Sequence, residues 1–391
     1  MTVLSDSLEF AARVSGKKCI VFGAGPSAQS MIVQFRYPVA YFVDNDESKW
    51  GKTFQGRIVA SPDELAQEDL DGVVVVIAST AVEEITVQLE RMGLISGLNF
   101  LVSPLIAGQM GEKNTIHPKL LVSCFEVDGG LYLVDINSGD KKFLLEGNLR
   151  GMQPHGDTIV VVDEHKGLIR LDTDFIEIQR CEMPDSVNMH GITFNPDENV
   201  FYVNETGRDR IGIYDAETLN RINEINLGRE SNPAFEQHHI NDVLYENGRL
   251  FVSMFSRQGV WRKNIWSDGC LASVDIKANK LDQILLGGLK QPHSILNDGG
   301  GMWICNSMDC SVWFGDQIMC QTNGYVRGLA KHQHYLYIGQ STMRRLDRFA
   351  NRFNNISLDC GILVWNIDNK TSRFVSLPAK SVFDILVLET D

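Results

Sequence analysis

The sequence predicts two domains of different class: a small α/β domain, followed by an all-β six-bladed propeller that is closed by its C-terminal strand. Strand and helix signals alternate over the first 110 residues, which is typical of a small parallel α/β sheet. From residue 120 onward the helical signal stops, and short β runs recur between Gly, Asn and Asp turns. We therefore expect one domain over residues 1–110, a linker over 111–119 and the propeller over 120–391.

The first domain opens with a short apolar run, Lys17–Phe22, which a glycine turn and a segment of helical character follow. A second strand is expected over Val39–Val43. Val73–Ala78 is a continuous, mostly β-branched run of the kind that forms a parallel strand covered on both faces. Ala81–Met92 has an apolar face at helical spacing. This order of elements predicts a Rossmann-like domain.

The second domain contains an internal repeat. Each unit has a short inner strand, an aromatic-apolar strand about ten residues later, and then a strand that often ends in Asp. The residues that lead the six inner strands are Arg150, His190, Asn241, His293, Arg327 and Phe383. Their spacings of 40, 51, 52, 34 and 56 residues lie near the roughly 40–50 residues of a four-stranded propeller blade.

The last repeat unit is split between the two ends of the domain. Its inner strand starts at Phe383, whereas its outer strands are expected over Leu120–Phe125, Leu131–Asp135 and Phe143–Leu145. A C-terminal strand that completes a blade begun near residue 120 closes the ring and removes its exposed sheet edges. A β-sandwich or two smaller sheets are the alternative architectures.

Composition and charge exclude several functions. The 391 residues carry a formal charge of −14, which argues against a bare nucleic-acid binder and against electrostatic capture on anionic membranes. No window reaches 18 consecutive apolar residues, and the first residues do not resemble a signal peptide. The eight cysteines are scattered without a CxxC pair, as in proteins whose thiols stay reduced. We therefore expect a cytoplasmic protein that binds a small molecule.

The glycine turn carries the first candidate site. Gly23-x-Gly25-x-x-Ala28 follows a strand and precedes a helix, where the missing side chains let a diphosphate approach the backbone. Asp44 ends the next strand, in a place where an acidic side chain can hold a ribose hydroxyl. These residues predict a site for NAD(P), another nucleotide or a nucleotide-sugar. The same turn also occurs in domains that bind nothing, and Pro26 removes one amide donor.

The propeller channel carries the second candidate site. His190, His239 and His293 come from three consecutive blades, and three imidazoles with an open fourth position suit a divalent metal such as Zn, Ca or Mg. The alternatives are a ligand site without metal and a polar, water-filled channel.

Other residues complete the expected channel site. Arg150 and Arg327 are expected to hold a carboxylate or phosphate of the substrate by forked hydrogen bonds. Asn241 and Asn306 are further candidates for substrate binding. Glu205, in a loop that opens on the same face, is the candidate general base.

Residues 17–105 resemble a known type of module. The motifs GAG, VDND, WGKTFQG and SPDEL resemble those of small Rossmann-like modules beside sugar-modifying acyltransferases and methyltransferases in surface-polysaccharide clusters. In the acyltransferases that module helps to bind a nucleotide-sugar. The resemblance implies a similar ligand for this domain.

Residues 120–391 resemble an uncharacterised bacterial family of six-bladed propellers through GMQPHGD, HHINDVLYENGRLFVSMFS, LKQPHSILNDGGGMWICNS and YVRGLA. More distantly the domain is similar to propellers of the gluconolactonase and amidating-lyase type. Those hold a divalent metal in the channel, and the lyases use three histidines. No catalytic motif in this sequence identifies either reaction.

Two functions of different class follow from these observations. The first is an enzyme that performs metal-assisted lyase, isomerase or hydrolase chemistry on a small anionic substrate, for which a sugar derivative is one candidate. The second is a non-catalytic protein that binds a ligand or uses the propeller as a platform for a protein partner. The histidines favour the first, and the lack of an assured acid–base pair favours the second.

Overall fold

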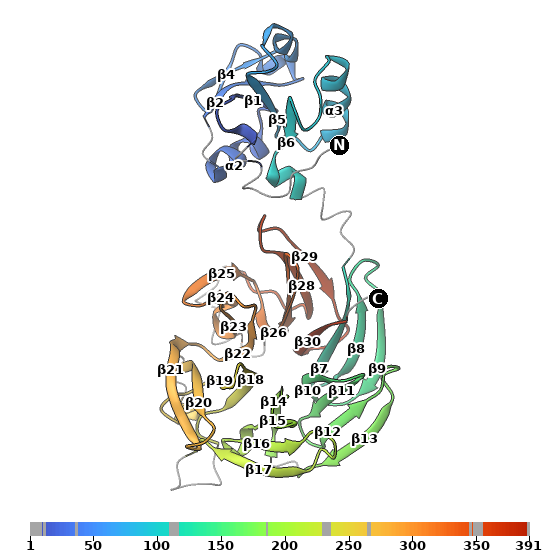
Figure 1. The fold of residues 1–391 in the computed structure, drawn as a ribbon, viewed down its shortest axis with the longest axis vertical. Helices are drawn as coiled ribbons and strands as arrows, with labels where there is room; N and C mark the ends of the chain where they lie inside the picture. Colours follow the sequence, from blue (N-terminus) through green and yellow to red (C-terminus); the bar gives the residue numbers. More distant parts are fainter. Residues whose placement is uncertain are drawn as a thin grey trace. The chain divides into compact units, whose positions relative to one another are not determined.

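A computed structural model describes Phe10 and residues 13–35, 38–108, 117–184, 187–228, 236–263, 267–343, 346 and 355–388. The chain divides into two compact units, Met1–Ile116 and His117–Asp391, both drawn as ribbons in Figure 1. None of the described helices is long and apolar enough to cross a membrane.

The N-terminal unit is built on a six-stranded mixed sheet. In the sheet the strands follow the order β3 (Thr53–Phe54), β4 (Arg57–Ala60), β2 (Val39–Val43), β1 (Lys18–Phe22), β5 (Val73–Ile77) and β6 (Phe100–Val102). All neighbours pair in parallel except β3 and β4, which are antiparallel. The α-helices with assigned bounds are α2 (Pro26–Phe35) and α3 (Val82–Arg91), and the short 3-10 helices are η1 (Glu47–Lys49) and η2 (Pro62–Gln67).

Both faces of this sheet are buried. In β1, Cys19 and Val21 pack with Met31 of α2, whereas Ile20 and Phe22 pack with α3. All five residues of β5 are buried, as the continuous run of β-branched residues predicts for a covered parallel strand. The glycine turn therefore lies at the carboxyl end of β1, where α2 begins.

The C-terminal unit consists of six four-stranded sheets arranged as the blades of a propeller (Figure 1). Blade 1 contains β10 (Leu149–His155), β11 (Thr158–Asp163), β12 (Gly167–Leu171) and β13 (Glu177–Glu182). Blade 2 contains β14 (Met189–Asn195), β15 (Val200–Glu205), β16 (Arg210–Asp215) and β17 (Arg221–Asn226). Blade 3 contains β18 (Ile240–Glu246), β19 (Arg249–Met254), β20 (Gly269–Asp275) and β21 (Lys280–Leu289).

The other three blades repeat this order. Blade 4 contains β22 (Pro292–Asn297), β23 (Met302–Asn306), β24 (Ser311–Phe314) and β25 (Gln317–Gln321). Blade 5 contains β26 (Tyr325–His332), β27 (Tyr335–Ser341), β28 (Gly361–Asn366) and β29 (Ser372–Ser376). Blade 6 combines β30 (Ser381–Leu388) with β7 (Lys119–Phe125), β8 (Gly130–Asp135) and β9 (Lys141–Glu146).

The split sixth blade closes the ring, as the sequence predicts. β30 pairs antiparallel with β7 along its whole length, from Ser381 opposite Phe125 to Leu388 opposite Lys119. Each of the six interfaces between neighbouring blades holds its own apolar cluster. Residues of β7 and β30 belong to the clusters on both sides of blade 6, so closure joins two interfaces at once.

The inner strands share one irregularity that positions the site. In every blade, the pairing between the first and second strands shifts register at or beside the leading residue. A β-bulge of this kind re-aims side chains and increases local twist. The leading residues that the repeat predicts are therefore the residues at which six bulges meet around the channel.

Deletion of residues 380–391 tests the closure. It removes Val382 and Ile385, which are at most 1% exposed, and the loss of each is expected to cost about 1.5–3 kcal/mol of folding free energy. The thermal melting temperature should fall, and limited proteolysis should begin within the propeller. Deletion of residues 389–391 alone leaves β30 intact and is the matched control. If the longer deletion melts like the full chain, the C-terminal strand does not close the ring.

Candidate functional site

Two arginines and an aromatic ring form one side of the channel mouth. The Arg150 guanidinium carbon lies 3.6 Å from the centroid of the Phe125 ring, and that of Arg327 lies 5.0 Å from the same centroid. Arg327 is also 4.7 Å from the centroid of Tyr325. Both cations therefore contact the same aromatic ring, an arrangement that cation–π attraction stabilises.

Histidines and aromatic rings form the other side. The ring centroids of His190 and His239 are 5.5 Å apart, and those of His239 and Phe255 are 4.1 Å apart. His293 follows, 5.1 Å from Phe255 and 5.6 Å from Tyr325. We call the whole set the mouth ring: Phe125, Arg150, His190, His239, Phe255, His293, Tyr325 and Arg327.

Glu164 links the two sides of the mouth ring. Its Oε2 lies 2.5 Å from Nη2 of Arg150, and its Oε1 lies 3.7 Å from Nε2 of His190. Burial alone would raise the pKa of Glu164, but His190 and the charge of Arg150 outweigh it and hold that pKa well below its usual range. Glu164 is therefore a carboxylate that neutralises Arg150.

The two best-buried histidines of the mouth ring are neutral. Burial, and then the charge of Arg150, lower the pKa of His190 to about 3. Burial and the charge of Arg327 lower the pKa of His293 well below its usual value. Nδ1 of His293 lies 2.7 Å from Oγ of Ser307 and 2.9 Å from the carbonyl oxygen of Gln291. Both imidazoles are therefore uncharged and can take part in hydrogen bonds as neutral groups.

Arg327 differs from Arg150 because it has no counter-charge. Arg327 forms no ion pair or side-chain hydrogen bond with the part of the chain that the structure describes, and its Nε is buried without a partner. Of the two arginines of the channel mouth, Arg150 is therefore neutralised by Glu164, whereas Arg327 has no opposite charge beside it among the described residues.

Further buried polar atoms at the leading positions lack partners within the described residues. The amide nitrogen and oxygen of Asn241, which is 1% exposed, have none, and neither has Nδ1 of His190. Buried polar groups are almost always hydrogen-bonded in folded proteins. These atoms therefore mark places where a ligand or ordered water completes the site.

The three histidines of the expected metal site are each in contact with other side chains. Over the described ranges, no group of three His, Cys, Asp or Glu side chains is placed to hold a metal ion. His239 directs Nδ1 to Glu236, His293 directs Nδ1 to Ser307, and the ring of Phe255 packs against both histidines. The three imidazoles belong to one ring of contacts but do not converge on one point.

Phe383, the leading residue of blade 6, packs against one side of the mouth ring. Its ring centroid lies 5.6 Å from that of His190, 6.1 Å from that of Phe125 and 5.1 Å from the Arg150 guanidinium. It thus touches side chains of blades 1, 2 and 6 and is 5% exposed.

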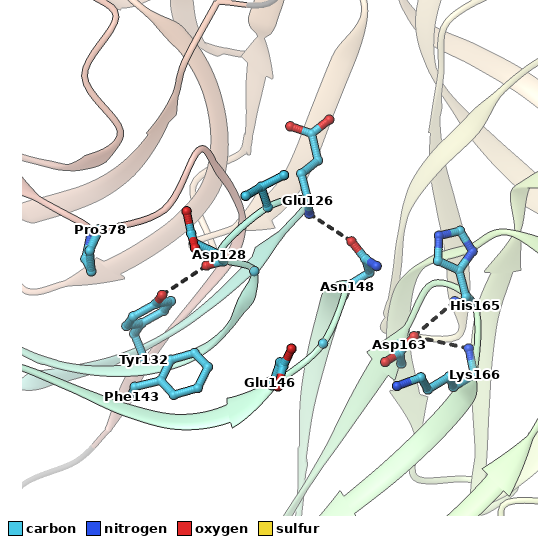
Figure 2. Close-up of a pocket in the computed structure, with 13 residues that line it drawn as sticks. Glu126, Asp128, Tyr132, Phe143, Glu146, Asn148, Asp163, His165, Lys166 and Pro378 are labelled. Atoms are coloured by element: carbon cyan, nitrogen blue, oxygen red, sulfur yellow. Dashed lines mark hydrogen bonds between the residues drawn. The ribbon is translucent and has the colours of Figure 1, made fainter.

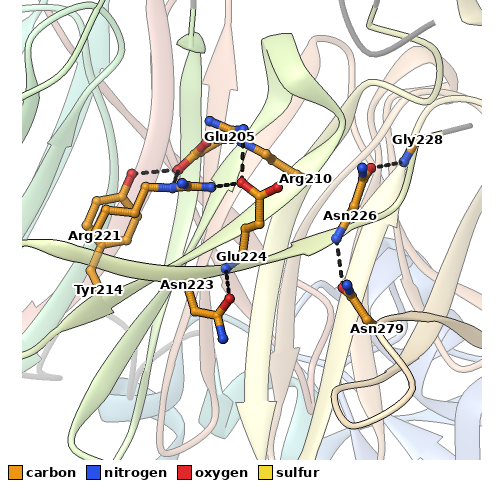
Figure 3. Close-up of polar contacts among 9 residues, drawn as sticks. All are labelled: Glu205, Arg210, Tyr214, Arg221, Asn223, Glu224, Asn226, Gly228 and Asn279. Carbon is orange, nitrogen blue, oxygen red and sulfur yellow. Dashed lines mark hydrogen bonds and ion pairs between the residues drawn. The ribbon is translucent and has the colours of Figure 1, made fainter. Parts of the chain in front are cut away.

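Glu205, the expected general base, does not face the channel. It is fully buried and accepts hydrogen bonds from Nε of Arg210, from Nε of Arg221 at 2.7 Å and from the Tyr214 hydroxyl at 2.7 Å (Figure 3). These partners lie on β16 and β17, the outer strands of blade 2, so the carboxylate points away from the inner strand. Donors on the outer strands contact both of its oxygens, so the carboxylate links three residues within blade 2.

The side chain of Asn306 is likewise hydrogen-bonded to nearby protein groups. Its Oδ1 accepts the N–H of Lys290 at 2.6 Å, and its amide donates to Asp309 at 3.3 Å. Glu164, which sequence reasoning missed, follows the residue of β11 that aligns with Glu205 in β15. The repeat could have indicated Glu164. Asp163 occupies the position in blade 1 that Glu205 occupies in blade 2, and Glu164 is the next residue in the loop.

A pocket of about 750 Å³ lies between blades 6 and 1 (Figure 2). Glu126, Asn148 and His165 line it, and they neighbour Phe125, Leu149 and Glu164 in the chain. Three further acidic residues line the same pocket: Asp128, Glu146 and Asp163. The charged groups that line this pocket are therefore mainly acidic, with Lys166 as the one lysine among the described lining residues.

The structure places Asp44 against the glycine turn itself. Its Oδ2 accepts the Ala24 N–H at 2.7 Å and lies 2.9 Å from Nζ of Lys49. Burial would raise the pKa of Asp44, but these partners outweigh it and hold that pKa below its usual value. Gly23 needs its missing side chain, with φ +107° and Ala78 O 3.1 Å from an added Cβ. Gly25 instead faces open space, with no atom within 4 Å.

No curated protein matches this chain. Residues 230–390 match a family described as a domain of unknown function (DUF4915), and residues 15–96 match one described as C2185-like, N-terminal. Together these matches cover parts of both units.

Similar solved structures include a protein of unknown function from Bacteroides caccae, with 14% identity, a TM-score of 0.50, and coverage of 68% of this chain and 98% of that chain. A nidogen–laminin complex has 10% identity, a TM-score of 0.48, and coverage of 68% and 97%. A luciferin-regenerating enzyme has 12% identity, a TM-score of 0.44, and coverage of 60% and 78%. At 14% identity, the structure from Bacteroides caccae bears on the fold alone.

Proposed function

We propose that the propeller binds a small organic anion at the channel mouth. The observation that carries this proposal is Arg327, a half-buried guanidinium held against Phe125 and Tyr325 without a counter-charge among the described residues. A buried charge that lacks a partner is costly, so a ligand that supplies the opposite charge gains affinity there. The planar guanidinium suits a carboxylate or a phosphate, which accept two parallel hydrogen bonds.

The rest of the mouth ring supports a ligand that also carries neutral polar groups. The unpartnered amide of Asn241 and Nδ1 of His190 suit hydroxyl or carbonyl groups. The rings of Phe255 and Tyr325 both contact His293 and supply apolar surface there. A hydroxylated carboxylate or phosphate, such as a sugar-derived anion, meets both requirements.

Binding is better supported than acid–base catalysis at the mouth ring. A general acid or base works best when its pKa lies near the working pH. The pKa of Glu164 is held well below its usual range, and that of His190 is about 3. Neither group readily exchanges a proton at neutral pH, so an enzymatic role requires another group in the channel.

Arg327→Met removes the unmatched charge and keeps a long side chain. We expect the affinity for carboxylates and sugar phosphates to fall roughly 10- to 100-fold, because a hydrogen bond to a charged group contributes about 1.5–3 kcal/mol. Isothermal calorimetry with a panel of hydroxy acids, sugar acids and sugar phosphates measures the change.

Arg249→Met is the matched control, because Arg249 is exposed at the start of β19, at the end of the strand away from Met254 and the mouth. Its affinity should equal that of the unmodified protein. Equal affinity of the Arg327 and Arg249 variants would contradict the proposal, and so would a panel in which no anion binds.

We also propose that the N-terminal unit, acting as a Rossmann-like domain, binds the phosphate of a nucleotide or nucleotide-sugar at its glycine turn. The open space above Gly25, at the carboxyl end of β1 and the start of α2, supports this proposal. Because its oxygens are already hydrogen-bonded, Asp44 would hold the turn in shape and would not bind ribose.

Gly25→Val tests the second site. The new side chain meets no protein atom at its Cβ, so the fold should persist, whereas the phosphate loses its approach to the backbone. We expect calorimetric binding of NAD(H), NADP(H) or UDP-sugars to fall at least about tenfold. Gly72→Val, whose Cβ also makes only ordinary contacts and which precedes β5 at the other end of the sheet, is the control. If none of these ligands binds the unmodified protein, the turn is only a packing feature.

A further inference from the structure

The pocket between blades 6 and 1 is used by no function above, and its lining combines carboxylates with aromatic rings (Figure 2). Blade 6 contributes the turn at residues 126–129 together with Tyr132 and Phe143. Blade 1 contributes Asp163 and Lys166, where β11 is joined to β12. The volume of about 750 Å³ suits a small organic molecule, because ligand pockets usually enclose about 300–1,000 Å³. We call it the acidic pocket.

The buried carboxylate of the acidic pocket is that of Asp163, which is 2% exposed. Its Oδ1 accepts the N–H groups of His165 and Lys166, both at 3.1 Å. Its Oδ2 takes part in no hydrogen bond or ion pair with the described residues. Gly147 leaves room for this oxygen, since a Cβ there would lie 2.9 Å from it. A buried carboxylate without a cation is costly, so a ligand that brings a positive charge to Oδ2 gains affinity.

Two exposed carboxylates of the same pocket also lack a cation. Neither Asp128 nor Glu146 forms an ion pair with any part of the chain that the structure describes. The other acidic residue of the described lining, Glu126, accepts a hydrogen bond from the Ser381 hydroxyl at 3.1 Å. The lining therefore carries more negative than positive formal charge, and a cationic ligand would reduce this imbalance.

Two aromatic rings lie beside these carboxylates. The ring centroids of Tyr132 and Phe143 are 5.1 Å apart, in an edge-to-face contact. The Tyr132 hydroxyl donates to the carbonyl oxygen of Asp128 at 3.0 Å, which holds the ring against the turn that carries this carboxylate. Phe143 remains 51% exposed although it lines the pocket. An exposed ring beside carboxylates favours organic cations, because ring faces attract positive charge and aliphatic chains bury apolar area against them.

The same lining does not suit a bare metal ion. No three His, Cys, Asp or Glu side chains in the described ranges are placed to hold one. A single ion would also leave most of the volume empty and would make no use of the Phe143 ring. An extended ligand with charged ends and an apolar middle matches both the carboxylates and the ring.

We propose that the acidic pocket binds a small organic cation with two or more ammonium or guanidinium groups on an aliphatic chain. One cationic group pairs with Oδ2 of Asp163, another is attracted by Asp128 and Glu146, and the aliphatic chain packs against Phe143. The acidic pocket shares no residue with the mouth ring, so this site is independent of the anion site proposed there.

Isothermal calorimetry of the full chain with putrescine, spermidine and agmatine tests the proposal. We expect at least one of these amines to bind saturably, with one molecule per chain, and to bind more weakly as the salt concentration rises. Choline and Mg²⁺ are the comparison probes, because choline has one charge without N–H donors and Mg²⁺ has no apolar surface. Both should bind at least about tenfold more weakly than the best amine. If none of the three amines binds saturably, or if Mg²⁺ binds as tightly as the best amine, the proposal is wrong.

Asp163→Asn tests where the amine binds. The substitution keeps the size of the side chain and an acceptor for the two backbone N–H groups, but it removes the negative charge. We expect the affinity for the best amine to fall about tenfold or more, because hydrogen bonds to charged groups are about twice as strong as neutral ones. Asp316→Asn is the matched control, since Asp316 is exposed between β24 and β25 of blade 4 and does not line the pocket.

Phe143→Ala is a second variant, and its half-exposed ring can be removed with little effect on the fold. It should weaken amine binding several-fold and leave the weak binding of Mg²⁺ unchanged. Thermal melting shows whether each variant folds, and if Asp163→Asn does not, Phe143→Ala decides alone. Variants that fold and bind the amine as tightly as Asp316→Asn would show that it binds elsewhere, and the proposal would be overturned.

Discussion

The pairing of β30 with β7 is the interaction on which the rest of the propeller depends. It joins the last strand of the chain to the first strand of the domain and seats apolar residues in the clusters on both sides of blade 6. Closure also builds the channel mouth. Phe125 ends β7, and Phe383 lies at the bulge of β30. This strand pair therefore contributes the Phe125 ring, which both arginines contact, and the Phe383 ring, which packs against it.

The chemistry of the channel follows from where charges are and are not matched. Arg150 pairs with Glu164, and the two best-buried imidazoles remain neutral, so Arg327 carries the charge at the mouth ring for which we find no partner among the described residues. Asp242 and Asp384, one residue after the leading positions of blades 3 and 6, each accept a hydrogen bond from a backbone N–H of the next blade. The proposed anion site rests on the guanidinium of Arg327, whose Nε is buried without a partner among the described residues.

The sequence predicted the six blades, the split sixth blade and the six leading residues because all of them repeat at nearly constant spacing, and the positions of repeated side chains follow from strand geometry. It did not predict which side chains contact one another. Phe255 packs against both His239 and His293, and neither the repeat nor residue type reveals that. The prediction for Glu205 was wrong because a shift of one residue changes which side chains a carboxylate contacts. Glu164 contacts His190 of the mouth ring, whereas Glu205 contacts Tyr214 on an outer strand.

The most direct test of this account is a crystal structure of the full chain grown with bromide, in which anomalous scattering locates the anion. The account predicts a bromide ion at the channel mouth, in contact with the guanidinium of Arg327 beside Phe125 and Tyr325. Bromide found only on the outer surface, with Arg327 paired to a carboxylate of its own chain, would contradict the claim that the mouth ring is built to receive an anion.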